Sequence, residues 1–302
     1  MYDVIIIGSG PAGLSAAIYT GRAKLKTLIF EAGVIGGNTA LTDLIDNYPG
    51  FPFGINGADL IENFRKQAER FGAELVFEEV VNLEEVPEGI KVITSDGKEY
   101  LTRAVIIAAG AKRRELGVPG EEEFVGRGVS YCATCDGAFF NNATVAVVGG
   151  GDSAVKEALY LSDIASKVYL IHRREEFRAN QTAVDKMKEK TNIELKLNKV
   201  ITHIKGEGLM DTITLKDVIT GEEEDINVEG LFISIGLVPA AEFLEELLET
   251  KDGYIITNEK METSMKGVYA AGDIRAKEAR QVATAVGDGV LAGIAVTEYL
   301  KE

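Results

Sequence analysis

The most constraining feature of this sequence is a pattern that occurs twice, with the second copy 141 residues after the first. The first copy, Tyr2 to Glu31, has an apolar run, a glycine-rich turn, a helical stretch and a second apolar run with an acidic end. The second copy, Thr144 to Arg174, follows the same order. Each copy predicts a strand, a crossover helix and a parallel strand, the unit from which doubly wound α/β domains are built.

The glycines of both copies match G-x-G-x-x-G/A between a strand and a helix. Gly8-Ser9-Gly10-Pro11-Ala12-Gly13 follows Val4–Ile7, and Gly149-Gly150-Gly151-Asp152-Ser153-Ala154 follows Val145–Val148. Such glycines allow a tight turn and close approach of the backbone to a pyrophosphate, which lies at the positive end of the helix dipole. The alternative is that these are ordinary glycine turns. That would explain a single match, but it does not readily explain two matches at equivalent positions. We therefore expect an α/β protein with two Rossmann-like dinucleotide-binding domains of the three-layer ββα type.

The end of the second strand in each copy indicates the nucleotide. Glu31 ends the second strand of the first copy, and an acid at this position accepts hydrogen bonds from a ribose diol, as in FAD. The equivalent of Glu31 in the second copy is His172, followed by Arg173 and Arg174, with Arg178 close behind. These cations suit the 2′-phosphate of NADPH. The alternative is a solvated basic patch.

Further strands and a helix complete a split arrangement of the chain. Glycine-ended apolar runs at 104–110 and 230–236 predict buried strands that reach a cofactor, although a plain buried strand explains their apolar part equally well. A third run ends in Gly272-Asp273, where a short acid can accept a hydrogen bond from a ribityl hydroxyl. We expect an FAD domain of residues 1–114 and 243–302. A domain of residues 115–242 that binds NADPH is inserted in it, and the chain crosses between the two near 112–117 and 237–242.

Arg280-Gln281-Val282 is expected to open a helix that runs to about Tyr299. Small residues in this stretch permit close packing, and its N-terminus could stabilise charge on reduced flavin. The alternative is a terminal helix that serves only stability.

The inserted domain contains Cys132-Ala133-Thr134-Cys135, followed by Asp136. The chain has two cysteines and two histidines, so a zinc site is not expected. A C-x-x-C pair indicates dithiol redox chemistry, with two structural thiols as the alternative. A helix beginning near Cys135 would lower the pKa of a thiol. Asp136 is either a proton carrier for the thiols or a helix-cap acceptor.

Charge and hydropathy exclude some function classes. The formal charge of −16 disfavours nucleic-acid binding. No apolar run of about 18 residues predicts a membrane span, and the apolar N-terminus disfavours a signal peptide, so we expect a cytoplasmic protein. The acidic runs at 121–123 and 222–225 are interpreted as solvated loops in preference to partner sites.

Six motifs follow one another along the chain: Gly8-x-Gly10-x-x-Gly13, Gly36-Gly37, Asn47-Tyr48-Pro49-Gly50, Cys132-Ala133-Thr134-Cys135-Asp136, His172-Arg173-Arg174 with Phe177-Arg178-Ala179, and Gly272-Asp273 with Arg280-Gln281-Val282. In their order and spacing, the chain resembles the low-molecular-weight thioredoxin reductases over essentially its whole length. In the related lipoamide dehydrogenase and glutathione reductase type, the cysteines follow the FAD fingerprint instead. The order of the motifs therefore points to the small-reductase branch.

The resemblance implies roles for individual residues. Cys135 would meet the flavin, Cys132 would attack the disulfide of thioredoxin, and Asp136 would donate a proton; the family is homodimeric. The residues expected to hold FAD are Gly8, Ser9, Gly10, Pro11, Ala12, Gly13, Glu31, Gly36, Gly37, Asn38, Asn47, Ala109, Gly110, Gly272, Asp273, Arg280, Gln281, Val282 and Ala283. Those expected to hold NADPH are Gly149, Gly151, Asp152, Ser153, His172, Arg173, Arg174, Arg178, Ile235 and Gly236.

Two positions depart from the family pattern. Asn38 stands where the family usually has glutamine, which could alter an FAD contact. Ala240-Ala241 stand where Asn-Thr is common, which could adjust a hinge. Neither departure removes a redox group.

The expected reaction is hydride transfer from NADPH to FAD, reduction of the Cys132–Cys135 disulfide, and dithiol exchange with thioredoxin. Because NADPH and the dithiol share a domain, we expect that domain to rotate between steps. Alternative acceptors are a glutaredoxin-like or peroxiredoxin-linked protein. Further alternatives are a ferredoxin– or flavodoxin–NADP reductase, which needs no dithiol, and a flavin-binding redox sensor.

Overall fold

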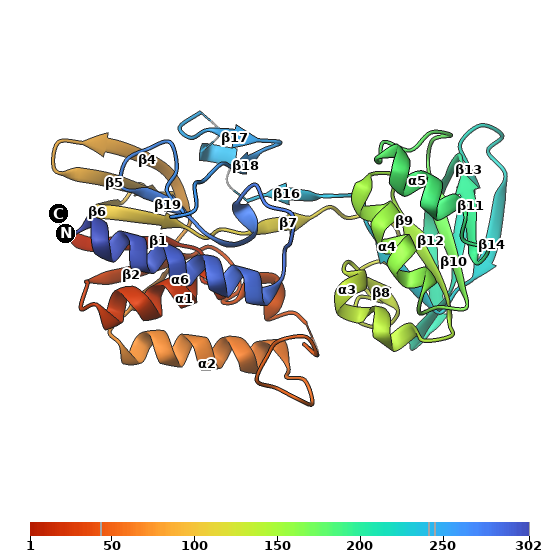
Figure 1. Cartoon of the computed structure of the whole chain (residues 1–302), viewed down its shortest axis with the longest axis horizontal. Helices are drawn as coiled ribbons and strands as arrows, with labels where there is room; N and C mark the ends of the chain where they lie inside the picture. The colour runs from red at the N-terminus through yellow and green to blue at the C-terminus, as the bar shows by residue number, and fades with distance from the viewer. Residues whose placement is uncertain (43, 241, 245, 302) are drawn as a thin grey trace. The chain divides into compact units, whose positions relative to one another are not determined.

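The computed structural model describes residues 1–42, 44–240, 242–244 and 246–301. It divides the chain into two compact units, Met1–Lys112 with Val238–Glu302, and Arg113–Leu237 (Figure 1). The second unit is therefore an insertion in the first. The boundaries expected from the sequence, after residues 114 and 242, lie two and five residues further along the chain.

The first unit is built on a mainly parallel sheet in the order β3-β2-β1-β6-β5-β4, with β19 beside the C-terminal half of β6. β4 and β5 form an antiparallel hairpin. The strands are β1 (Tyr2–Ile7), β2 (Thr27–Glu31), β3 (Glu74–Phe77), β4 (Val80–Val86), β5 (Gly89–Thr94), β6 (Glu99–Ile107) and β19 (Val268–Ala270). Short pieces follow the return of the chain, namely η3 (Glu242–Leu244), β17 (Thr250–Lys251), β18 (Tyr254–Ile255) and η4 (Gly272–Ile274).

Three helices cover one face of this sheet: α1 (Pro11–Arg22), α2 (Gly57–Arg70) and α6 (Val282–Tyr299) (Figure 1). Successive side chains of β1 alternate between faces, so Val4 and Ile6 pack toward the helices while the next residues along the strand pack toward the β4–β5 hairpin. α6 begins and ends as expected from the sequence. Its small residues let it lie against α1: a Cβ on Gly289 would come within 2.1 Å of the Ala12 carbonyl oxygen.

The second unit repeats these layers. Its parallel sheet has the order β11-β10-β9-β15-β8, formed by β8 (Val129–Ser130), β9 (Thr144–Val148), β10 (Lys167–His172), β11 (Ile193–Leu197) and β15 (Gly230–Ile233). α4 (Asp152–Ser162) and α5 (Gln181–Lys188) pack on one face. The antiparallel sheet β12 (Lys199–Glu207), β13 (Leu209–Asp217) and β14 (Glu223–Asn227) packs on the other. The expectation of two Rossmann-like domains in three ββα layers is confirmed.

Two short strands carry the chain between the units. β7 (Ala111–Arg113) and β16 (Leu237–Pro239) pair with each other. β16 lies within the second crossing segment expected from the sequence, 237–242, whereas β7 begins one residue before the first, 112–117, and overlaps only its start. Ala240 follows β16 and its N–H donates to the Gly110 carbonyl oxygen at 3.1 Å, whereas Ala241 lies outside the described residues.

The interpretation of the acidic runs as solvated loops is wrong at two places. Glu121 is 5% exposed, and its carboxylate accepts hydrogen bonds from the N–H groups of Leu116 and Gly117 and from the Tyr131 hydroxyl. Three donors compensate for the loss of water around this charge. Glu223–Asp225 belong to strand β14 rather than to a loop.

Candidate functional site

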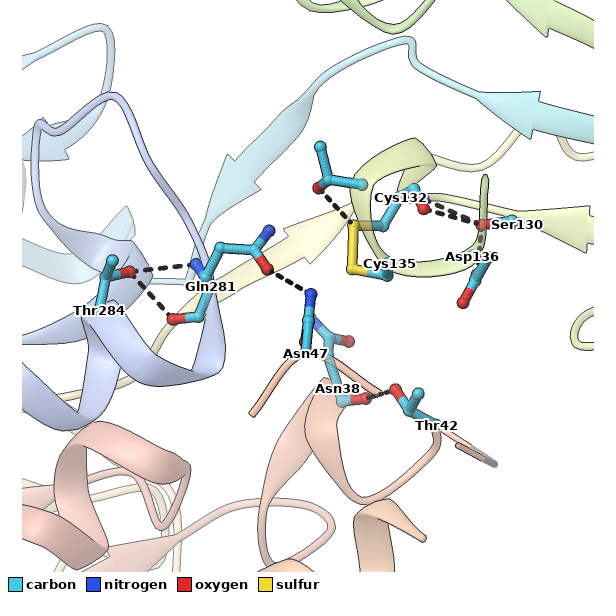
Figure 2. The surroundings of a disulfide bond; sticks show 10 residues. Asn38, Thr42, Asn47, Ser130, Cys132, Cys135, Asp136, Gln281 and Thr284 are labelled. Carbon is cyan, nitrogen blue, oxygen red and sulfur yellow. Dashed lines mark hydrogen bonds between the residues drawn. A yellow bond between two sulfur atoms is a disulfide. The ribbon is translucent and has the colours of Figure 1, made fainter. Parts of the chain in front are cut away.

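Cys132 and Cys135 form a disulfide with an S–S distance of 2.09 Å (Figure 2). Both cysteines are half-buried. The short helix α3 (Ala133–Asp136) begins directly after Cys132, which is its N-cap residue, so the helix starts two residues before the expected position near Cys135. Because the pair is bonded, the alternative of two separate structural thiols is also wrong.

Ser130 organises the turn that holds the disulfide. It ends β8, and its hydroxyl donates to a carboxylate oxygen of Asp136 at 2.5 Å while accepting the N–H of Cys132 at 3.1 Å (Figure 2). A hydroxyl bound to an ionised carboxylate gives a short hydrogen bond of this kind. Sequence reasoning missed Ser130, although a polar residue at the end of a buried strand before C-x-x-C was a usable signal.

Asp136 lies one helical turn from Cys132, and its N–H donates to the Cys132 carbonyl oxygen at 3.1 Å. The sequence left open whether it is a proton carrier or a helix-cap acceptor. Although it precedes the helix η2 (Gly137–Phe140), its side chain makes no capping bond to it within the described chain. The cap alternative is therefore wrong, and the carboxylate is instead bound by the Ser130 hydroxyl.

The first glycine turn, between β1 and α1, is tied to the end of β2. Glu31 accepts hydrogen bonds from the Ser9 N–H at 2.9 Å, from the Ser9 hydroxyl at 2.6 Å and from the Gly33 N–H at 2.8 Å. Gly36 in turn donates to the Ser9 carbonyl oxygen at 3.1 Å. The start of α1 has no side-chain cap among the described residues. This turn thus presents uncapped helix N–H groups, which suit a pyrophosphate, beside a fixed acid, which suits a ribose.

The segment that follows β19 presents a half-buried acid, Asp273. Asp273 has a buried Oδ1 atom with no hydrogen-bond partner among the described residues, and the Lys277 ammonium lies 3.8 Å away. Burial raises the pKa of this carboxyl, against the opposing effect of Lys277 and Arg280. A buried acceptor atom without a hydrogen bond is costly unless a ligand supplies a donor. The Asp273 carboxylate therefore fits a ligand hydroxyl, such as that of a ribityl chain.

The N-terminus of α6 is fixed by side chains from separate parts of the same unit. Gln281 caps the helix in a reciprocal capping box with Thr284, and its side-chain oxygen accepts a hydrogen bond from Asn47 at 3.1 Å (Figure 2). Arg280 donates to the Asp273 carbonyl oxygen at 3.3 Å. Asn38, which stands where the family usually has glutamine, uses its side-chain amide within the chain: the amide donates to the Ala111 carbonyl oxygen at 3.0 Å.

Asp288, on α6, is a residue that sequence reasoning missed. Its carboxylate accepts the Gly272 N–H at 3.1 Å and hydrogen bonds from Arg275 and Lys277, both at 2.8 Å. The side chains of all three charged residues are only 13% exposed. Asp288 therefore connects the helix to the loop that presents Asp273. The available signal was an acid between two glycines, Gly287 and Gly289, of this helix.

The second glycine turn, between β9 and α4, is joined to the segment that carries the arginines. The Arg178 N–H donates to the Gly150 carbonyl oxygen at 2.8 Å, and the Asn180 N–H donates to the Asp152 carboxylate at 2.8 Å. The side chains of Arg173, Arg174 and Arg178 are exposed. Within the described part of the chain they form no ion pairs. Unpaired cations beside a glycine turn fit a ribose phosphate.

Two other expected residues of this unit lie beyond the end of β15. Ile235 is half-buried, and Gly236 accepts a hydrogen bond from the Arg114 N–H at 3.2 Å. Glu157, on α4, was not expected. Its Oε2 atom is buried and has no hydrogen-bond partner among the described residues. Burial raises the pKa of this carboxyl to about 7, and the Ser234 side chain opposes the rise.

Comparisons with known proteins agree with this arrangement. The family model described as "Pyridine nucleotide-disulphide oxidoreductase" matches residues 2–289. The chain is 47% identical to a thioredoxin reductase of Bacillus subtilis, over 100% of this chain and 96% of that protein. It is 44% identical to one of Treponema pallidum, over 99% and 97%. The crystal structure of a Streptococcus pyogenes thioredoxin reductase matches with a TM-score of 0.95 at 42% identity, over 100% and 98% of the two chains.

The described residues contain no cluster of three or more histidine, cysteine or acidic residues that could hold a metal ion. None of the helices they form is long and apolar enough to cross a membrane.

Proposed function

This chain belongs to the pyridine nucleotide-disulphide oxidoreductase family, and we propose that it is a thioredoxin reductase that uses NADPH and FAD. The observation that carries the proposal is the bonded Cys132–Cys135 pair, with the Asp136 carboxylate one turn away. A ferredoxin– or flavodoxin–NADP reductase has no use for this arrangement. The final acceptor is thioredoxin or a thioredoxin-like protein.

The unit that contains β1 is assigned to FAD. The uncapped start of α1 would receive the pyrophosphate, Glu31 the adenosine ribose, and Asp273 a ribityl hydroxyl. Gly36 and Arg280 are hydrogen-bonded to Ser9 and to Asp273, and Asn47 is hydrogen-bonded to Gln281 at the start of α6, so these residues are assigned to FAD as well. When bound, FAD accepts a hydride from NADPH and passes the electron pair to the disulfide.

The inserted unit is assigned to NADPH. Its turn at Gly149–Ala154 would hold the pyrophosphate, and the exposed Arg173, Arg174 and Arg178 would hold the 2′-phosphate. These arginines are the reason to prefer NADPH over NADH, because the 2′-phosphate of NADPH supplies the negative charge that their side chains can bind.

The chain's own thiols perform the exchange with the partner. Once the disulfide is reduced, the Cys132 thiolate attacks the disulfide of thioredoxin and forms a mixed disulfide, which releases one partner thiol. The Cys135 thiolate then attacks the Cys132 sulfur, which re-forms the internal disulfide and releases the second partner thiol. Asp136, held by Ser130, supplies and accepts the proton that these thiols exchange.

Three further features complete the proposal. The two units are joined by the short strands β7 and β16, which would allow the inserted unit to rotate between steps. Tyr19, Leu291 and Ile294 form exposed apolar positions on α1 and α6, which support a homodimer. A dithiol that must be kept reducible suits the cytoplasm.

A steady-state assay tests the proposal. The holoenzyme should oxidise NADPH in the presence of oxidised thioredoxin, and Cys135→Ser should abolish this while leaving electron transfer to an artificial acceptor such as ferricyanide. Thioredoxin reduction that survives in Cys135→Ser would overturn the proposal. If the enzyme reduces a glutaredoxin or a peroxiredoxin disulfide faster than it reduces thioredoxin, that protein replaces thioredoxin as the assigned acceptor.

A further inference from the structure

His172 ends β10, immediately before the arginines, and direct contact with a phosphate is the role that its position in the sequence suggests. Its surroundings differ from those of its neighbours. The His172 side chain is buried, with an exposure of 6%, whereas Arg173, Arg174 and Arg178 are exposed. A ligand that approaches the arginines from solvent therefore meets three guanidinium groups, while the imidazole ring lies within the protein.

The ring fills the space between the arginine segment and the glycine turn. It stacks on Phe177, with 5.3 Å between ring centroids and 18° between planes. Its Nε2 atom lies 3.1 Å from the Glu176 carbonyl oxygen. On the other side it meets Gly150, where a Cβ would lie 2.0 to 2.4 Å from three atoms of the imidazole ring. Only a residue without a side chain fits there while the ring is in place.

Backbone hydrogen bonds hold the same two segments together around the ring. Gly149 donates to the carbonyl oxygen of Ile171 at 3.0 Å, and Arg178 donates to that of Gly150 at 2.8 Å. The ring therefore sits between the turn that faces a pyrophosphate and the segment that carries the cations. Its thickness fixes the distance between these two parts.

The protonation state of the ring agrees with a structural contact. Because a carbonyl oxygen only accepts hydrogen bonds, Nε2 carries the proton. Burial lowers the pKa of His172, and Arg178, Arg173 and Arg174 lower it further, against the opposing effect of the Glu176 carbonyl. In the described part of the chain, the acid at the start of α4, Asp152, accepts a hydrogen bond from the Asn180 N–H and forms none with the ring. A neutral ring adds no positive charge to a phosphate site.

We infer that His172 is a positioning residue that sets the preference for NADPH over NADH by fixing the arginine segment against the glycine turn, without binding the 2′-phosphate itself. The inference rests on the proposed function, since it presumes that NADPH binds to this unit. It assigns the charge recognition to the three arginines and the spacing to the ring. Removing the ring should therefore weaken recognition of the 2′-phosphate although every cation remains.

The test compares His172→Ala and His172→Gln with wild type. Glutamine keeps an N–H donor near the position of Nε2, whereas alanine leaves a void. The kcat/KM ratio of NADPH to NADH should fall about tenfold in His172→Ala, mainly through KM, and by less than threefold in His172→Gln. Unchanged flavin absorbance and thermal unfolding would show that both variants fold. A ratio that does not change in His172→Ala, or that falls equally in both variants, would overturn the inference.

A pH series separates positioning from direct charge recognition. The probe is adenosine 2′,5′-bisphosphate, titrated calorimetrically into the holoenzyme and its His172→Ala variant. The ratio of the two dissociation constants should stay constant from pH 8 to pH 6. A ratio that grows several-fold toward pH 6 would show a charged histidine on the phosphate and refute the inference. Arg173→Ala and Arg174→Ala distinguish failure of this inference from failure of the proposed function. If NADPH does not bind to this unit, both variants would leave the coenzyme preference unchanged.

Discussion

Glu157 allows a prediction whose size follows from the structure. Its carboxyl on α4 is largely removed from water, with one oxygen lacking a partner among the described residues, and burial raises its pKa from 4.5 to about 7. Between these two values the folded protein binds more protons than the unfolded chain. The free energy of unfolding therefore falls as the pH rises from about 4.5 to about 7. At about 1.4 kcal/mol for each pH unit, Glu157 costs up to about 3 kcal/mol at pH 8.

Glu157→Gln should remove this cost because the amide is neutral at every pH and has nearly the same shape. We expect the variant and wild type to unfold at similar urea concentrations at pH 4.5, and the variant to be more stable by up to about 3 kcal/mol at pH 8. The measurement is urea unfolding of the holoenzyme, followed by circular dichroism and by flavin fluorescence. Glu189→Gln, at an exposed position of the same unit, is the control and should give equal curves at both pH values.

The reasoning about Glu157 fails if the stability difference between variant and wild type is the same at both pH values. It also fails if the difference is larger in acid. Either result would mean that the carboxylate has a partner or water that burial alone does not indicate. Coincidence of the two probes is needed for a single free energy to describe each transition.

The remaining predictions concern other parts of the site. Asp136→Asn should lower the rate of thioredoxin reduction at least about a hundredfold while electron transfer to ferricyanide continues, because only the thiol steps need its proton; equal losses in both assays would contradict this. Asp288→Asn should raise the dissociation constant of FAD about tenfold, measured by fluorescence on dilution, because one charged partner of Arg275 and Lys277 is lost; the exposed Glu298→Gln is the control. Leu291→Glu combined with Ile294→Glu should convert a dimer to a monomer in light scattering, and an unchanged mass would place the dimer contact elsewhere.

Much of the fold could be predicted because its signals are local and repeated. A glycine turn between an apolar run and a helix is specified within about 30 residues, and two equivalent copies fix both sheets. Glu121 shows where this fails. Its burial depends on Tyr131 and on N–H groups of Leu116 and Gly117, which only the folded chain brings together. From the sequence, three successive acids look like a solvated loop.

The candidate site divides along the same line. Cys132 and Cys135 belong to a short motif and could be found by spacing. The start of α3 could not, because a helix of one turn has no periodicity to read. Asp288 acts through partners that lie 11 to 16 residues away and that have no common pattern with it. Residues that serve by holding others in place leave little trace in a single sequence.

In both copies of the pattern, the residue that ends the second strand contacts the second residue of the glycine turn, but the chemical groups that make this contact differ. Ser9 and Glu31 in the first copy are equivalent to Gly150 and His172 in the second. In the first, the serine donates two hydrogen bonds to the acid; in the second, the imidazole ring occupies the space that a side chain on the turn would need. In both, the residue that ends the second strand fixes the second residue of the glycine turn. The exchange of acid for histidine therefore removes a carboxylate that would repel a phosphate and preserves the contact that holds the turn, which explains why a glycine accompanies the histidine.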